Sequence, residues 1–130
     1  YLRPVCSDIA LLVPRRAPVL VLTKGVELGT HELMLDVAAE ELGGRARCAV
    51  LSGPNHAEEV CLGTLSAAVL ASESPEVAAR LQALLVNTNF RVYVSQDVTG
   101  VEVCGAVKNV VAIACGAAVG MPATTRSPSS

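Results

Sequence analysis

Val19-Leu20-Val21-Leu22-Thr23-Lys24-Gly25 is the stretch of sequence on which the fold depends. Residues 19–23 form a short run of branched, apolar side chains, as expected for a strand that is covered on both faces. Lys24 follows at once, at the carboxyl end of this strand, and ligands of open α/β sheets bind at that edge. Gly25 would let a ligand come close to the backbone. Lys24 is therefore a candidate binding residue, and an exposed loop lysine is the alternative.

Helical and strand patterns alternate along the rest of the chain. A helix is expected over residues 2–13, stopped by Pro14, and a second helix is expected to follow Thr30 as its cap and to end at Gly43-Gly44. Further expected elements are strands over 47–51, 67–71 and 90–94, and helices over 55–61 and 76–85, the last capped by Ser74 with Pro75 at its first position. This alternation predicts an α/β unit with a largely parallel sheet.

The last regular segment, residues 100–120, is apolar or small almost throughout. Such a helix is expected to be surrounded by protein on all sides, as at a domain junction. Its longest apolar stretch, Val110 to Met121, is shorter than the roughly 20 residues of a bilayer span, so no membrane span is expected. Residues 122–130 are polar and contain proline, and they are expected to be disordered.

The composition excludes some classes of protein. Hydrophobic residues make up 52% of the 130 residues, which is enough apolar material for a core, and the net charge is only −2. Aromatic side chains are nearly absent and the basic residues form no stripe, so nucleic-acid binding has little support. Five cysteines without C-x-x-C spacing lie in apolar runs, and we expect them to be reduced and buried in a cytosolic protein.

Lys108 is the clearest anomaly, because it stands in the apolar segment and is followed by Asn109. Burial would penalise the charged form of the ammonium group and lower its pKa, which makes a lysine a usable base near neutral pH. The alternative is a lysine that reaches solvent or pairs with Glu102.

Two further motifs could carry chemistry. Ser52-Gly53-Pro54-Asn55 follows an expected strand and leads into a helix, whose free N–H groups could hold an anion or a carboxamide. A plain strand-to-helix turn is the alternative. His56 is followed by two glutamates, but no second histidine lies at ligand spacing, so no metal site is expected. His31 is expected to be solvated in the first turn of its helix.

Several blocks of the sequence, taken in order, carry a resemblance. They are Thr23-Lys24-Gly25-Val26-Glu27, residues 51–60 (LSGPNHAEEV), Phe90-Arg91-Val92-Tyr93, residues 97–102 (DVTGVE) and residues 105–110 (GAVKNV). The ordered set resembles the bacterial NAD(P)-dependent glycerol-3-phosphate dehydrogenase family, from about Leu2 to about Met121. Each block alone is a weak match, but the five blocks in this order are specific to the family.

The resemblance implies a fold and a reaction. Residues 1–95 would be the second part of a Rossmann-type, largely parallel sheet, residues 96–121 the first long buried helix of an all-α substrate domain, and residues 122–130 a disordered tail. The parent enzyme would use NAD or NADP to interconvert dihydroxyacetone phosphate and sn-glycerol 3-phosphate, the precursor of glycerophospholipids. A cytoplasmic location and a homodimer of the full-length enzyme are further expectations.

The same resemblance implies roles for individual residues. Lys108 would be the catalytic lysine that exchanges a proton with the C2 oxygen, and Asn109 would lie beside it in the substrate site. Lys24 would contact both substrate and cofactor. The remaining contacts would be made by Gly53 and Asn55 with the substrate and by Ala57 with the nicotinamide nucleotide. Asn55 departs from the family pattern, in which serine or threonine is frequent.

Other departures concern whole parts of the family's site. No G-x-G-x-x-G occurs in the chain, so the pyrophosphate of the cofactor has no loop to bind. The family's helical domain, with an aspartate and an Arg-Asn pair for the substrate phosphate, is also missing. The chain is therefore expected to be an internal fragment. The alternative is a truncated or frame-shifted remnant without activity, at most an association module.

Overall fold

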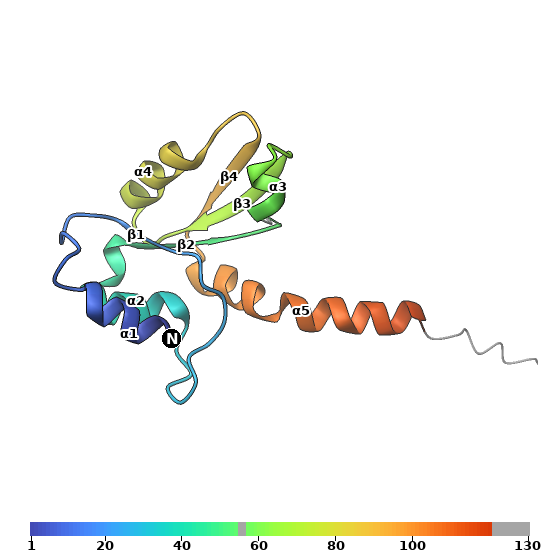
Figure 1. The fold of residues 1–130 in the computed structure, drawn as a ribbon, viewed down its shortest axis with the longest axis horizontal. Coiled ribbons are helices and arrows are strands. Elements are labelled where there is room, and N and C mark those ends of the chain that lie inside the picture. The colour runs from blue at the N-terminus through green and yellow to red at the C-terminus, as the bar shows by residue number, and fades with distance from the viewer. Residues whose placement is uncertain (55–56, 121–130) are drawn as a thin grey trace, which may run out of the picture.

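The computed structural model describes residues 1–54 and 57–120, which form four strands, five α-helices and one 3₁₀ turn (Figure 1). The predicted tail at 122–130 lies outside the described residues. In chain order the elements are α1 (Leu2–Ile9), β1 (Val19–Val21), α2 (Met34–Leu42), η1 (Arg45–Arg47), β2 (Cys48–Ser52), α3 (Ala57–Cys61), β3 (Ser66–Ala71), α4 (Pro75–Leu85), β4 (Phe90–Ser95) and α5 (Val98–Gly120).

The four strands form one mixed sheet in the order β1-β2-β3-β4. β1 pairs with β2 in parallel, and so does β3 with β4, whereas β2 and β3 are antiparallel. The predicted α/β unit with a largely parallel sheet is confirmed. The antiparallel pair was not expected; the five-residue helix α3 between these strands is not among the elements that make extensive contacts with the sheet. Without a crossover helix, β3 returns directly alongside β2.

Helices cover both faces of the sheet, and the side chains of β2 alternate between them. Cys48 and Val50 face α2 and α5, in a core that includes Leu35 and Val98. Ala49 and Leu51 face α4, in a core with larger members from β3, β4 and α4: Leu70, Leu81, Phe90 and Val92. β2 is thus buried on both faces, as expected for a central strand of an α/β sheet.

Helix boundaries agree with the sequence where a side chain caps the helix locally. The Ser74 hydroxyl accepts a hydrogen bond from the Val77 N–H at 3.3 Å, with Pro75 at the first position of α4, as predicted. Gly43 ends α2 in the left-handed conformation, also as predicted. α1 ends at Ile9 rather than Val13, because residues 10–13 form turns before Pro14.

The start of α2 was predicted wrongly. The helix begins at Met34, four residues after Thr30, and Thr30 does not cap it. Instead the Thr30 hydroxyl donates to Glu27, within a tight turn closed by a hydrogen bond of 2.8 Å from the Glu27 N–H to the Glu32 carbonyl. His31 has a φ of 63° in this turn, so it does not lie in a first helical turn. The Thr30 hydroxyl, which was expected to cap the helix, is therefore bonded within this turn.

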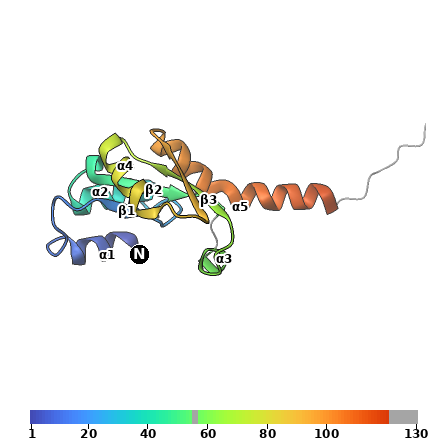
Figure 2. The ribbon, with the colours of Figure 1, turned by 90° about the horizontal axis from the view of Figure 1, so that it is seen from above.

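Helix α5 is exposed over most of its length, which contradicts the predicted burial. Val98, Glu102 and Gly105 are buried, whereas every residue from Val107 to Gly120 is exposed. Its 23 residues would extend about 34 Å at 1.5 Å per residue, twice the roughly 17 Å of a five-residue strand. Its second half therefore continues past the sheet, where no described element covers it (Figures 1 and 2).

α5 is also apolar enough to resemble a membrane helix. Among residues 1–54 and 57–120, it is the one helix whose length and composition would suffice for a bilayer span, and 6% of its most apolar window is buried. Core helices of other proteins pass the same test. The absence of a membrane span stays a prediction.

The cysteines are all free, but their expected burial is correct for two of the five. Cys6 and Cys48 are buried, and burial raises the pKa of both thiols. Cys61 on α3 and Cys104 and Cys115 on α5 are exposed. Cys115 lies in the half of α5 that continues past the sheet.

Arg3 joins α1 to the turn before α2 and to α2 itself. Its guanidinium group contacts four carboxylates, those of Glu27, Glu32, Glu40 and Glu41, at 2.7 to 3.0 Å. The hydrogen bonds from Arg3 to Glu27 lower the pKa of Glu27 to about 2, and a bond from Thr30 adds to this effect. This cluster is the main polar attachment of α1.

The Glu27 ion pair predicts a dependence of stability on pH. Because the folded pKa of Glu27, about 2, is below its ordinary value of 4.5, the pair stabilises the fold above pH 4.5. This contribution is lost as the pH falls toward 2. We expect Glu27→Gln to lower the melting temperature above pH 5, and the difference from wild type to vanish near pH 2. Thermal unfolding followed by circular dichroism measures it, and a difference that is constant with pH would contradict it.

Candidate functional site

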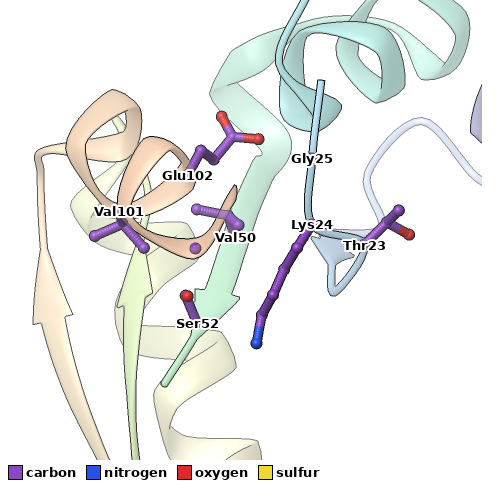
Figure 3. A pocket seen from close by; sticks show the side chains of 8 residues that line it. Thr23, Lys24, Gly25, Val50, Ser52, Val101 and Glu102 are labelled. Atoms are coloured by element: carbon purple, nitrogen blue, oxygen red, sulfur yellow. The ribbon is translucent and has the colours of Figure 1, made fainter. Parts of the chain in front are cut away.

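A narrow crevice lies at the carboxyl ends of β1 and β2, where α5 crosses the sheet (Figure 3). Lys24 lies just beyond β1, and its side chain runs along the crevice toward the end of β2, where Ser52 lies. The lining comes from three segments: Thr23, Lys24 and Gly25, then Val50 and Ser52, then Val101, Glu102 and Gly105. The predicted place of Lys24, beyond the carboxyl end of a strand, is confirmed, and its part in binding stays a prediction.

Gly105 allows α5 to approach this edge closely. A Cβ atom at position 105 would lie 2.9 Å from the Ser52 hydroxyl oxygen and 3.7 Å from Cγ of Lys24. A larger residue would push the helix away from the strand ends. Gly105 therefore sets how near the following turn of α5 comes to Lys24.

Glu102 fixes the same part of α5 from within the core. Its side chain is 6% exposed, and Oε1 accepts a hydrogen bond of 2.8 Å from the Leu35 N–H. Leu35 is in the first turn of α2, so the carboxylate satisfies a free helix donor from a distant element. Oε2 has no partner among the described residues. Burial raises the pKa of Glu102, against a smaller opposing effect of the Leu35 bond.

The sequence did not reveal this role. The alternative in which Glu102 pairs with Lys108 is wrong, because the described contact of Glu102 is with Leu35. One available signal was that Asp97 and Glu102 are the last two acidic residues of the chain, in and just before a helix with few polar residues. A carboxylate kept in such a segment is usually paired.

Glu102→Gln is expected to stabilise the chain at neutral pH. The amide oxygen can still accept from Leu35, and the buried charge is removed. Since the folded pKa is above the ordinary value of 4.5, ionisation of Glu102 weakens wild-type folding as the pH rises from 4.5 through the raised pKa. The melting temperature of Glu102→Gln should exceed that of wild type more at pH 7 than at pH 4.

Glu102→Ala provides the contrast, because it leaves the Leu35 N–H without its acceptor. It should destabilise at both pH values by about 1–3 kcal/mol. Equal pH profiles for wild type and Glu102→Gln would show that the carboxyl titrates normally in the folded chain.

Gly53 lies beside the crevice, in a neighbouring hollow of about 380 Å³ that Ser52, Asp97, Gly100 and Cys104 also line. A Cβ atom at position 53 would lie 2.7 Å from the Ala67 carbonyl oxygen and 2.8 Å from Cα of Ala68. Glycine is therefore required by the backbone of β3. Ser52, which lines both hollows, was not singled out from the sequence.

Lys108 and Asn109 lie one turn beyond Gly105 on α5. At 100° per residue, Lys108 is in line with Val101, and Asn109 with Glu102, so both continue the helix face that packs on the sheet. Both are exposed, because α5 has passed the edge of the sheet at this point. The prediction that the Lys108 ammonium group is desolvated is therefore wrong for the part of the chain that the structure describes. The chain contains two lysines, 24 and 108; Lys24 lines the crevice, and Lys108 lies on α5 beyond it.

Two of the remaining predicted positions are not tested, and one is not brought into the site. Asn55 and His56 lie outside the described residues. Ala57 begins α3, is exposed and lines neither hollow. Within residues 1–54 and 57–120, no group of three or more potential metal ligands gathers.

Comparisons with known proteins agree on one family. Residues 1–78 match the family described as NAD-dependent glycerol-3-phosphate dehydrogenase N-terminus, and residues 97–128 match its C-terminus. The glycerol-3-phosphate dehydrogenase, NAD(P)+, of Brucella ovis is 45% identical over 88% of this chain and 35% of its own length. That of Geobacillus kaustophilus is 39% identical over 92% of this chain and 36% of its own length.

A solved structure supports the same relationship. The crystal structure of glycerol-3-phosphate dehydrogenase from Coxiella burnetii superposes with a TM-score of 0.78 at 36% identity, over 92% of this chain and 36% of that protein. The chain thus spans about a third of the length of the curated relatives it matches. The matches to both parts of the family, in order along the chain, show that it belongs to the NAD-dependent glycerol-3-phosphate dehydrogenase family.

Proposed function

We propose that this chain is the internal part of an enzyme that interconverts dihydroxyacetone phosphate and sn-glycerol 3-phosphate with NAD or NADP. The observation that carries the proposal is the crevice at the carboxyl edge of β1 and β2, where Lys24 is held beside the helix that bears Lys108. A cation in the crevice and a second one further along the helix that borders it suit a substrate that carries a phosphate and develops charge on oxygen. In the cell, the product would enter glycerophospholipid synthesis in the cytoplasm.

Lys108 is assigned to proton transfer. In reduction it donates a proton to the C2 oxygen of the ketone, and in oxidation it removes the proton from the C2 hydroxyl group. Asn109 lies beside it and can bind a substrate oxygen through its amide. In the full-length enzyme, we expect the exposed second half of α5 to be covered, and this would supply the desolvation that Lys108 lacks here.

Lys24 is assigned to contacts with both substrate and cofactor, because its ammonium group lies at the mouth between the strand ends. Gly53 and Asn55 are assigned to the substrate, and Ala57 to the nicotinamide nucleotide. No side chain fits at position 53, so the substrate would contact the backbone groups of Gly53.

The dinucleotide does not fit these 130 residues by themselves. A pyrophosphate needs a glycine-rich turn between a strand and a helix N-terminus. The loop after β1 runs through residues 22–33 before α2 begins, and no G-x-G-x-x-G occurs in the sequence. We therefore assign to this chain substrate contact and proton transfer, and we expect cofactor binding only in the full-length enzyme, which we expect to be a homodimer.

A chimera tests the proposal. Residues 1–120 would replace the matching segment of the Coxiella burnetii enzyme, and oxidation of NADH and NADPH would be followed with dihydroxyacetone phosphate. We expect turnover by the chimera and none by the isolated chain. A chimera that folds and binds NADH but has no turnover with this substrate would contradict the proposal.

An inactive association module is the second candidate, and the exposed apolar face of α5 favours it. Light scattering of the purified chain separates the candidates when it is combined with the chimera. A molar mass that rises with concentration, together with an inactive chimera, would favour association. A stable mass with an active chimera would favour the enzyme.

A further inference from the structure

A second polar cavity lies at the amino ends of β1 and β2, the opposite edge of the sheet from the Lys24 crevice. Its volume is about 190 Å³. Three arginines from three segments line it: Arg16 just before β1, Arg47 just before β2, and Arg80 on α4. The topology therefore gathers three guanidinium groups at one place that the reaction does not use.

The charge of this cavity is not neutralised by the protein. Arg16, Arg47 and Arg80 make no ion pair with any carboxylate among residues 1–54 and 57–120, whereas the nearby Arg45 is paired. Glu76 is the one carboxylate in the lining. Three positive groups against one negative group leave an excess of two positive charges, which attracts an anion.

Arg47 has donors that need an acceptor. Its Nη1 donates to the Leu42 carbonyl at 3.1 Å, which holds the side chain in place. Its Nε and Nη2 are buried and have no partner among the described residues. Buried polar groups without a partner are rare in folded proteins, and a shift of the Arg47 side chain into the cavity that it lines would give these donors a bound ion as acceptor.

The start of α4 adds to the positive potential. Ser74, which caps this helix, lines the cavity, and the N-terminal end of an 11-residue helix carries a partial positive charge. The cap and the arginines are independent features, and both favour an anion here.

We propose that Arg16, Arg47 and Arg80 bind a small phosphate-bearing anion at this edge of the sheet. Guanidinium groups bind phosphate oxygens through paired, charge-assisted hydrogen bonds. The volume suits inorganic phosphate or a small phosphate monoester, since pockets for larger ligands are usually above about 300 Å³. The site is separate from the proposed reaction, and its occupant can influence the start of β1 and β2 without touching the crevice.

A titration of the purified chain with inorganic phosphate, at low salt, tests the site. Amide NMR signals are expected to shift and saturate at Ala46 and Val77, which also line the cavity. Arg80→Gln and Arg16→Gln remove exposed side chains and should leave the fold intact by circular dichroism. Each should weaken binding about tenfold, the size expected for loss of one charge-assisted contact. Arg15→Gln, the neighbouring exposed arginine outside the cavity, should bind phosphate as wild type does.

Further experiments locate the bound ion and limit its size. Amide signals that shift and saturate at Thr23 and Gly25 in place of Ala46 and Val77, and that are lost in Lys24→Ala but not in Arg80→Gln, would place the ion in the crevice and overturn the proposal. Absence of saturation would also overturn it, as would tighter binding of AMP than of inorganic phosphate. None of these results depends on turnover by the chimera, so failure here is distinct from failure of the proposed reaction.

Discussion

Lys108→Ala in the chimeric enzyme is expected to lower kcat by about 100- to 10,000-fold, the range for removal of a general acid or base. Alanine keeps the helix intact and cannot carry a proton. Lys108→Arg should fail almost as completely, since a guanidinium group stays charged and does not release a proton near neutral pH. Steady-state oxidation of NADH measures both variants.

Lys24→Ala is the comparison for Lys108→Ala, because these are the two lysines of the chain. Loss of a substrate contact should appear mainly as a higher KM, whereas loss of proton transfer appears in kcat. If Lys108→Ala kept more than a tenth of the chimera's kcat, the assignment of proton transfer to Lys108 would be wrong.

Gly53→Ala is expected to destabilise the chain by about 1–3 kcal/mol, the usual cost of forcing an extra methyl group into a packed site. The new Cβ would lie 2.7 Å from the Ala67 carbonyl oxygen, and both are attached to backbone that cannot move away easily. The pairing of β2 with β3 should loosen as a result. Urea unfolding followed by circular dichroism measures the change.

Gly116→Ala is the matched control, with the same substitution on exposed α5. A Cβ at position 116 meets nothing within 4 Å, so the higher helix propensity of alanine should stabilise by up to about 1 kcal/mol. Equal urea midpoints for Gly53→Ala and wild type would rule out the close approach. A destabilised Gly53→Ala would also mean that lost activity at this position reflects folding as well as substrate contact.

Local patterns predicted most of the elements. Strands and helices from Arg45 onward were found within one or two residues, and Ser74-Pro75 marked the start of α4. The errors occurred where a distant residue supplied what a local one was expected to supply. Thr30 was expected to cap a helix whose first turn is in fact satisfied by Glu102, 67 residues away from Leu35.

Exposure was predicted least well. The composition of α5 indicated burial, but burial requires a covering element, and none of the described residues covers the helix after Ala106. The same reasoning explains the exposed Cys115. Apolar character shows that a residue favours a dry environment, and it does not show that this environment is present.

By itself, the sequence determined the α/β class, the position of Lys24 at the carboxyl edge of a strand, and the resemblance that singled out Lys108. Each of these depends on neighbours in the chain, through periodicity, turn residues and short motifs. Only the tertiary structure showed the antiparallel β2–β3 pair, the Glu102 bond to α2, the backbone that requires Gly53, and the arginine cavity at the far edge. These features join residues far apart in sequence, and such contacts depend on how the elements pack rather than on their local patterns.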